Sequence, residues 1–280
     1  MAVSEKLRAL VDQMPNPDDR GMYCKDINKD KIEKAVAEIH KGGRENVLGL
    51  VEMLGEPGAA ENVKPHYALH CVANYTLVTE GEGRKELCET LASQLDNDDL
   101  STFNKGYLCQ ELQWAGRKEA APALGKLLLN EDLVEPAAMA LAGIGGEEAI
   151  KQLREALPKA KGKCRLNIID GLAALADAGS AKAFKEALKD TDREVRIAAG
   201  AGLAKIGDAA AVDDLIEAAG AEPGWERIQA TKNCLVLAEK LAADGKMDAA
   251  KKIYNYLRES RKDPSEKYVK DQAEKALDAL

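Results

Sequence analysis

The histidines of this 280-residue chain limit the chemistry available to it, because there are only three of them. Two of them, His66 and His70, form an H-x-x-x-H pair. On a helix this spacing puts both rings on one face, where they can share a metal ion. The metalloprotease form of the pair needs a glutamate directly after the first histidine, and Tyr67 stands there. We therefore expect no metal at this pair and predict a helix face that points to solvent or into a groove.

The cysteines and carboxylates also lack a reactive arrangement. No C-x-x-C spacing occurs among the six cysteines, which are Cys24, Cys71, Cys88, Cys109, Cys164 and Cys234. In a chain of this size, such scattered cysteines are typical of small buried side chains rather than of a disulfide framework or a redox site. Adjacent carboxylates such as Asp213 and Asp214 point apart on a helix, so they do not form an acid–base pair. We expect a protein that is not an enzyme and has no catalytic residue and no cofactor.

Charge and hydropathy exclude two further classes of function. The chain has 40 basic and 48 acidic residues, and no block of lysine and arginine stands out. Binding to a phosphate backbone needs clustered positive charge, so we expect no nucleic acid partner. No apolar stretch approaches the roughly 20 residues that span a bilayer. Charged residues also interrupt positions 1–10, where a signal peptide would need an apolar core. A soluble protein is expected, with the cytoplasm favoured over an exported form whose leader has been removed.

An internal repeat predicts the fold. Residues 130–157 align with residues 192–219 without a gap, at an offset of two units of about 31 residues. Identical pairs include Ala137/Ala199, Leu141/Leu203, Ile144/Ile206 and Gly145/Gly207. Aromatic residues make up only 4% of the chain, which favours thin helix-on-helix packing over a sheet sandwich. A unit this thin cannot bury its own apolar face and is stable only when it stacks on neighbours.

Each unit has the pattern of a helical hairpin. The clearest one predicts a first helix over 181–188, a polar turn over 189–192 and a second helix over 194–206. Apolar residues recur in the second helix at three- and four-residue steps, which form one buried stripe. Either Asp192 or Thr191 is positioned to cap this helix, and Gly207 to end it in the left-handed conformation. No stretch alternates with period two, so we predict no strands.

The motif Asp192-Arg193-Glu194-Val195-Arg196, followed by Leu203-Ala204-Lys205-Ile206-Gly207-Asp208, resembles the HEAT repeat of the phycobilisome-lyase-like subclass. The resemblance is strong over 192–219, good over 118–157 and looser over 44–116. It departs from the pattern at 134–136, where Val-Glu-Pro replaces the Val-Arg pair. The resemblance implies an all-α fold: an α-solenoid, wound as a right-handed superhelix of about eight hairpins and sixteen helices. Such a fold is used mostly as an interaction scaffold.

The ends of the chain differ from the repeats, as expected for solenoid caps. We predict an N-terminal helical cap over 1–43, with helices at 4–14 and 29–40 joined by a turn-rich link. The HEAT-like array follows over 44–245. The last segment, 246–280, resembles a tetratricopeptide-type hairpin and forms the C-terminal cap of one continuous solenoid.

The large aromatic side chains are the best candidates for a binding surface, because interface hot spots are enriched in tryptophan and tyrosine. Tyr67, Tyr75, Tyr107 and Trp114 fall on predicted second helices of the N-terminal half. The candidate partner-binding residues are Tyr67, His70, Tyr75, Tyr107, Trp114, Trp225 and Arg227. The alternative is that these rings only fill the less regular repeats of 44–116.

Two functions remain after these exclusions. The first is a non-catalytic scaffold that binds a protein or peptide segment on the concave face of the solenoid. The second is a subunit of an enzyme, such as a lyase-type complex that attaches a chromophore or cofactor, which the repeat subclass suggests.

Overall fold

The structure is a computed structural model that describes residues 3–20, 23–55, 62–79 and 83–280. Its described residues form sixteen α-helices, in agreement with the all-α prediction, and none of these helices is long and apolar enough to cross a bilayer. The chain divides into two compact units, Met1–Ala156 and Leu157–Leu280. The boundaries of the caps and the array, and the handedness of the superhelix, stay predictions.

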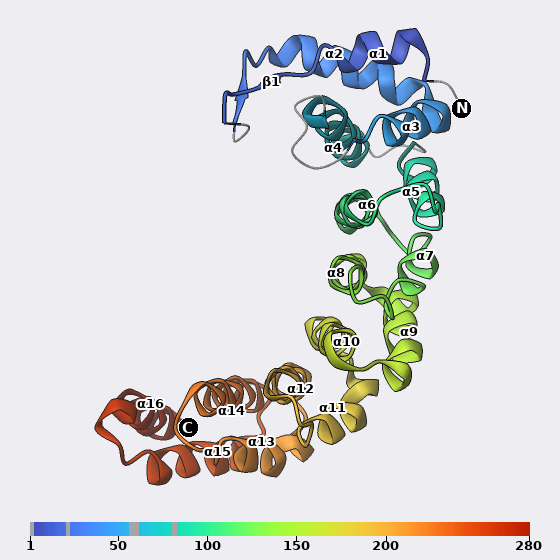
Figure 1. Ribbon diagram of the computed structural model, residues 1–280. Helices are drawn as coiled ribbons and strands as arrows, with labels where there is room; N and C mark the ends of the chain where they lie inside the picture. Colours follow the sequence, from blue (N-terminus) through green and yellow to red (C-terminus); the bar gives the residue numbers. More distant parts are fainter. Residues whose placement is uncertain (1–2, 21–22, 56–61, 80–82) are drawn as a thin grey trace. The chain divides into compact units, whose positions relative to one another are not determined.

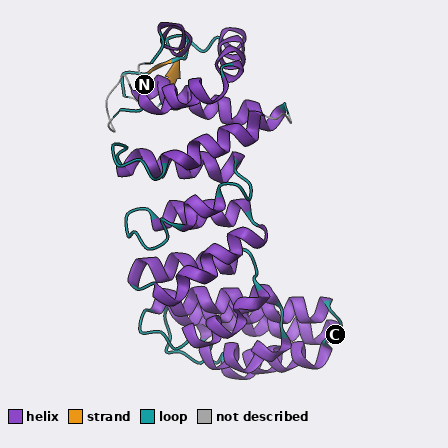
Figure 2. Ribbon diagram, turned by 90° about the vertical axis from the view of Figure 1, so that its right-hand side faces the viewer, coloured by secondary structure: helices purple, strands orange, loops and turns teal. Residues whose placement is uncertain are grey.

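The first unit stacks its helices in two rows (Figures 1 and 2). Its helices are α1 (Glu5–Val11), α2 (Lys29–Lys41), α3 (Gly43–Glu52), α4 (Val63–Val78), α5 (Gly83–Gln94), α6 (Thr102–Ala115), α7 (Ala121–Gly125), α8 (Val134–Ile144) and α9 (Gly146–Ala156). The second helices α4, α6 and α8 pack against one another in one row, and α3, α5, α7 and α9 form the other. Ser101 begins α6, because its hydroxyl accepts a hydrogen bond from the amide of Asn104 at 3.3 Å.

The prediction that the chain has no strands was wrong for the link between α1 and α2. Strands β1 (Asn16–Pro17) and β2 (Cys24–Lys25) pair antiparallel there, drawn in orange in Figure 2. The amide of Asp18 donates to the carbonyl of Tyr23 at 2.6 Å, which continues the pairing toward the turn. Two residues per strand are too few to produce the alternation by which sequence analysis detects a strand.

The second unit follows the predicted hairpin pattern. Its helices are α10 (Gly162–Ala174), α11 (Ala181–Ala187), α12 (Arg193–Ile206), α13 (Val212–Ala218), α14 (Trp225–Ala243), α15 (Met247–Ser260) and α16 (Lys267–Ala279). Short 3-10 turns precede four of them, at Leu157–Lys159, Ala178–Ser180, Ala209–Ala211 and Pro264–Glu266. The carboxylate of Asp192 accepts from the amide of Glu194 at 2.9 Å, and Gly207 ends α12 at φ +77°, so both predicted caps are confirmed.

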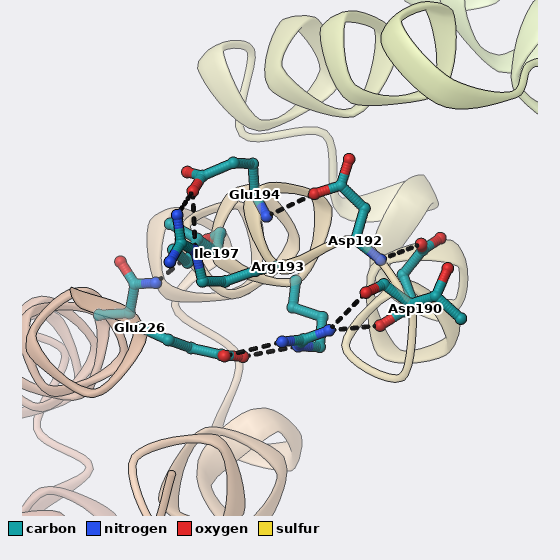
Figure 3. Close-up of polar contacts among 9 residues, drawn as sticks. Asp190, Asp192, Arg193, Glu194, Ile197 and Glu226 are labelled. Carbon is teal, nitrogen blue, oxygen red and sulfur yellow. Dashed lines mark hydrogen bonds and ion pairs between the residues drawn. The ribbon is translucent and has the colours of Figure 1, made fainter. Parts of the chain in front are cut away.

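A series of arginines, which sequence analysis did not identify, connects consecutive hairpins of the second unit. They stand near the start of α10, α12 and α14, at intervals of one repeat, and each pairs with a carboxylate of the next hairpin. The pairs are Arg165 with Asp190 at 2.7 Å, Arg196 with Glu226 at 2.6 Å and Arg227 with Glu266 at 2.7 Å. Arg196 also donates to the backbone carbonyls of Asp190 and Thr191, and Figure 3 draws these contacts beside the labelled Asp190 and Glu226. Its counterpart in α8 is Val134, which is buried, so the motif's departure at 134–136 removes this contact from the first unit.

Four of the six cysteines are the small buried side chains that were predicted, whereas Cys24 and Cys71 are only partly buried. All six are free thiols, and Cys88, Cys109, Cys164 and Cys234 are buried. Burial raises the pKa of the Cys109 and Cys234 thiols to about 12. These two thiols therefore stay protonated at physiological pH and are poor nucleophiles.

Candidate functional site

A groove of about 650 Å³ lies on the row of second helices in the first unit. Residues from α4, α6 and the start and middle of α8 line it: His70, Thr102, Phe103, Gly106, Tyr107, Gln110, Glu111, Gln113, Trp114, Asp132, Glu135, Pro136 and Met139. On α6 the lining positions recur at three- and four-residue steps, so they form one stripe along that helix. A second stripe from α8 forms the facing wall.

Two glycines show how these walls are aligned. A Cβ built on Gly106 of α6 would lie 3.9 Å from Pro136 of α8, and one built on Gly143 of α8 would lie 2.8 Å from Gln113 of α6. Helices α6 and α8 therefore run in the same direction. Phe103 lies at the end of the groove where α8 begins, and Trp114 lies at the opposite end.

Large apolar side chains are exposed along this groove. Phe103 is 50% exposed, Trp114 61% and Met139 52%. Exposed apolar groups cost free energy in water, and in a concave surface they are typical of a binding site. Sequence analysis named only Trp114 of these three. Phe103 lies one helical turn before Tyr107, and this spacing is the signal that would have added it to the predicted stripe.

The charged residues of the groove are mainly acidic. Glu111 forms part of its floor, with a side chain that is only 3% exposed. Asp132 and Glu135 are exposed near the start of α8. The described lining contains no lysine and no arginine, so its formal charge is negative whether or not His70 is protonated.

His70 donates a hydrogen bond to the buried carboxylate. Its Nδ1 lies 3.1 Å from Oε1 and 3.2 Å from Oε2 of Glu111, and a carboxylate only accepts, so Nδ1 carries the proton. Its Nε2 lies 2.9 Å from the amide nitrogen of Asn74, which donates to it. The bond to Glu111 raises the pKa of His70, so this carboxylate favours the positively charged imidazole beside it.

Tyr107 joins two walls of the site instead of projecting from them. Its hydroxyl donates to the backbone carbonyl of His66 at 2.6 Å, and the two rings lie 4.4 Å apart. Burial raises the pKa of Tyr107, and the nearby Glu111 raises it further. His66 in turn donates from Nδ1 to the carbonyl of Asn62 at 2.8 Å. Tyr107 therefore attaches α6 to α4, and only part of its ring faces the groove.

Sequence families match the repeats that build this architecture. The family of HEAT repeats matches residues 159–235, and the family of PBS lyase HEAT-like repeats matches residues 137–157. The chain carries HEAT repeats. Together with the helical pairs of both units, these matches show an all-α, HEAT-like solenoid. No curated protein sequence matches the chain.

Solved structures resemble the HEAT-repeat chain only at low identity. An engineered protein is 20% identical with a TM-score of 0.50, and the alignment covers 97% of this chain and 77% of that one. The complex of CpcE and CpcF of phycocyanin lyase from Nostoc sp. PCC7120 is 18% identical with a TM-score of 0.39, covering 89% and 92%. Human deoxyhypusine hydroxylase is 15% identical with a TM-score of 0.34, covering 98% and 95%. At these identities the first similarity shows the fold alone.

Three of the seven predicted partner-binding residues of this HEAT-repeat protein lie in the groove. The structure places His70, Tyr107 and Trp114 in one groove. Tyr75 instead packs against His40 of α2, with ring centroids 5.1 Å apart.

The other three predicted residues also lie outside the groove. Tyr67 lies beside Cys71 on α4, and burial raises the pKa of its hydroxyl. Trp225 is half-exposed in the second unit, at the start of α14. Arg227 there is held by Glu266, so its guanidinium connects two hairpins of its own chain.

The metal-binding capacity of the described residues is small. They contain no group of three or more histidine, cysteine, aspartate or glutamate side chains that could hold a metal ion. The two rings of the H-x-x-x-H pair do not face a common ligand position. His66 donates to a backbone carbonyl, and His70 donates to Glu111.

The two histidines of α4, His66 and His70, are expected to give the free energy of unfolding opposite dependences on pH. The hydrogen bond to Glu111 raises the pKa of His70, so its contribution is present below 6.5 and is lost as the pH rises through the raised value. Burial lowers the pKa of His66, so its contribution is present above 6.5 and is lost as the pH falls through the lowered value. Urea unfolding at about pH 8 and about pH 5 should show that His70→Asn costs more at the acidic pH and His66→Asn more at the basic pH. Equal pH dependence of the two variants would contradict these assignments.

Proposed function

We propose that this HEAT-repeat protein is a non-catalytic scaffold that binds a segment of another protein in the groove between α6 and α8. The observation that carries the proposal is the exposure of three large apolar side chains, Phe103, Trp114 and Met139, along one concave surface. HEAT repeats are themselves consistent with protein partners. The described lining supplies no nucleophile–base pair and no cluster of basic residues, which favours binding over chemistry and a protein over a nucleic acid.

The dimensions of the groove limit what enters it. Phe103 and Trp114 are eleven positions apart on α6, which corresponds to about 17 Å along the helix axis. An extended chain covers that length with about five residues. A short segment therefore fills the groove, and further contacts would have to come from the surfaces beside it. A subunit of an enzyme complex would use the same groove, so this alternative changes the partner but not the surface.

The binding function is tested by selecting short random peptides displayed on phage against the purified chain. We expect peptides whose binding falls about tenfold or more in Trp114→Ala, because hot-spot tryptophans carry much of the energy of an interface. The melting temperature of this variant should stay nearly unchanged, because the ring is mostly exposed. Trp225→Ala is the matched control, since it removes an exposed tryptophan from the second unit.

A second variant, Gly106→Leu, adds a side chain to the groove, whereas Trp114→Ala removes one. A Cβ on Gly106 would meet only Pro136, at the ordinary contact distance of 3.9 Å, so a side chain can begin at this position and the longer one of Gly106→Leu would occupy groove volume. Leucine also favours a helix over glycine by roughly 0.5–1 kcal/mol, so the variant should melt no earlier than the parent chain. Selected peptides should lose binding to it. If peptide binding survives both Trp114→Ala and Gly106→Leu but fails in Trp225→Ala, the binding surface lies on the second unit and the proposal is wrong.

A further inference from the structure

The groove has a charge that a bound segment must match. Its described lining carries the carboxylates of Glu111, Asp132 and Glu135 and no lysine or arginine. An acidic segment would be repelled by this lining, and a neutral one would gain no electrostatic attraction from it. A basic segment is therefore the complementary partner.

Glu111 is the most buried member of this set. Its carboxylate is nearly removed from water and accepts a hydrogen bond from Nδ1 of His70. A buried carboxylate is costly unless it is paired, and a paired one forms short, strong hydrogen bonds. Closing the groove over Glu111 with an uncharged group would remove its remaining water without replacing it. A cation brought by the partner avoids that cost.

The rings beside Glu111 select the kind of cation. Tyr107 lies four positions before it on α6 and Trp114 three positions after it, so both aromatic side chains lie on the same stripe as the carboxylate. A planar guanidinium can donate two hydrogen bonds to a carboxylate while its face lies against an aromatic ring. A lysine ammonium binds as a point charge and lacks this planar fit.

We infer that the segment bound in the groove inserts an arginine side chain between Tyr107 and Trp114 to pair with Glu111, and places an apolar neighbour against Met139. This inference rests on the proposed binding function and adds the chemical class of the partner to it. Asp132 and Glu135 extend the negative surface toward the start of α8, so a second basic residue of the same segment fits that end.

The charge of the selected peptides is the first test. We expect peptides that depend on Trp114 to be enriched in arginine, next to a large apolar residue. Synthetic copies in which that arginine is replaced by citrulline, its neutral isostere, should bind about tenfold or more weakly by fluorescence polarisation. Copies with lysine in its place should fall between the two. Binding should also weaken between about 50 mM and about 300 mM salt.

The matched variant on the protein side is Glu111→Gln. A glutamine Oε1 can still accept the hydrogen bond from His70, so this change removes the charge but keeps the contact. Arginine peptides should bind it about tenfold or more weakly, and citrulline peptides should bind it and the parent chain equally. Glu155→Gln is the control, because Glu155 is exposed on α9, in the other row of helices.

The outcomes separate this inference from the proposed function. If the selected peptides need Trp114 but show no preference for arginine, or bind Glu111→Gln as tightly as the parent chain, the groove binds proteins and the inference is wrong. If no selected peptide depends on Trp114, both fail. Self-association that is lost in Trp114→Ala would identify a second copy as the occupant and would also overturn the inference.

Discussion

Replacement of Arg261 by alanine is expected to lower the free energy of unfolding by about 3–5 kcal/mol, since removal of one partner from a buried polar network leaves the others unpaired. The side chain is fully buried in the second unit. Its guanidinium donates to the carbonyl of Ala219 and to the hydroxyl of Thr231, each at 2.8 Å. It also lies 3.4 Å from a carboxylate oxygen of Glu266 and over the ring of Tyr256. The alanine variant would lose all four contacts and leave a cavity.

Arg258→Ala is the matched control for this prediction. Arg258 lies in the last turn of α15, three positions before Arg261, but its side chain is 40% exposed and pairs with the adjacent Glu259. Its loss should change stability by no more than about 0.5 kcal/mol. Chemical denaturation measures both variants, and hydrogen exchange should show that protection falls first around α13, α14 and α16, which Arg261 joins. Equal losses in the two variants would show that the buried network contributes no more than a surface pair.

Phe184 packs against Gly202, and removal of its ring is expected to lower the free energy of unfolding strongly. It should also reverse the effect of Gly202→Ala, which is destabilising on its own. Phe184 of α11 is fully buried, and Phe184→Ala should cost about 3–5 kcal/mol through lost contacts and a cavity. A Cβ on Gly202 of α12 would lie 2.7 Å from the ring, so Gly202→Ala alone should cost about 1–3 kcal/mol through overpacking.

The double variant tests whether these two residues are coupled. In the Phe184→Ala background, the methyl group of Gly202→Ala fits into the cavity that the ring leaves. Alanine also favours a helix over glycine, so adding Gly202→Ala to Phe184→Ala should be neutral or stabilising. Urea denaturation of the two single variants and the double variant gives the coupling free energy. Lys182→Ala, at a highly exposed position of α11, is the control that should add independently to Gly202→Ala. Strict additivity with Phe184→Ala would mean that the backbone of α12 moves to admit the methyl group.

The repeat fold was predictable because its determinants are local. The apolar stripe of α12, the capping carboxylate of Asp192 and the left-handed glycine at 207 are each encoded within a few residues of where they act. The two-residue strands escaped prediction because they are set by one turn rather than by a pattern. The arginine series escaped because its partners, such as Glu226 for Arg196, lie about one repeat further along the chain.

The groove was only partly predictable for the same reason. Sequence periodicity placed Tyr107 and Trp114 on a second helix, but it could not show which of them faces outward. That difference depends on the hydrogen bond from Tyr107 to the carbonyl of His66, a contact across 41 positions. Glu111 gave no signal at all, because one glutamate in an acidic chain becomes distinctive only when its burial and its bond to His70 are known.

The arginine series has a consequence for how such a chain can lengthen. The hairpin formed by α11 and α12 contains both an acceptor, Asp190, and a donor, Arg196, six positions apart. If the DNA that encodes this hairpin were duplicated, the new copy would offer its aspartate to the arginine before it and its own arginine to the glutamate after it. Each added copy would thus contain both the aspartate and the arginine that it needs for its ion pairs with the neighbouring hairpins. Growth by tandem duplication would therefore need no compensating substitution at the junction.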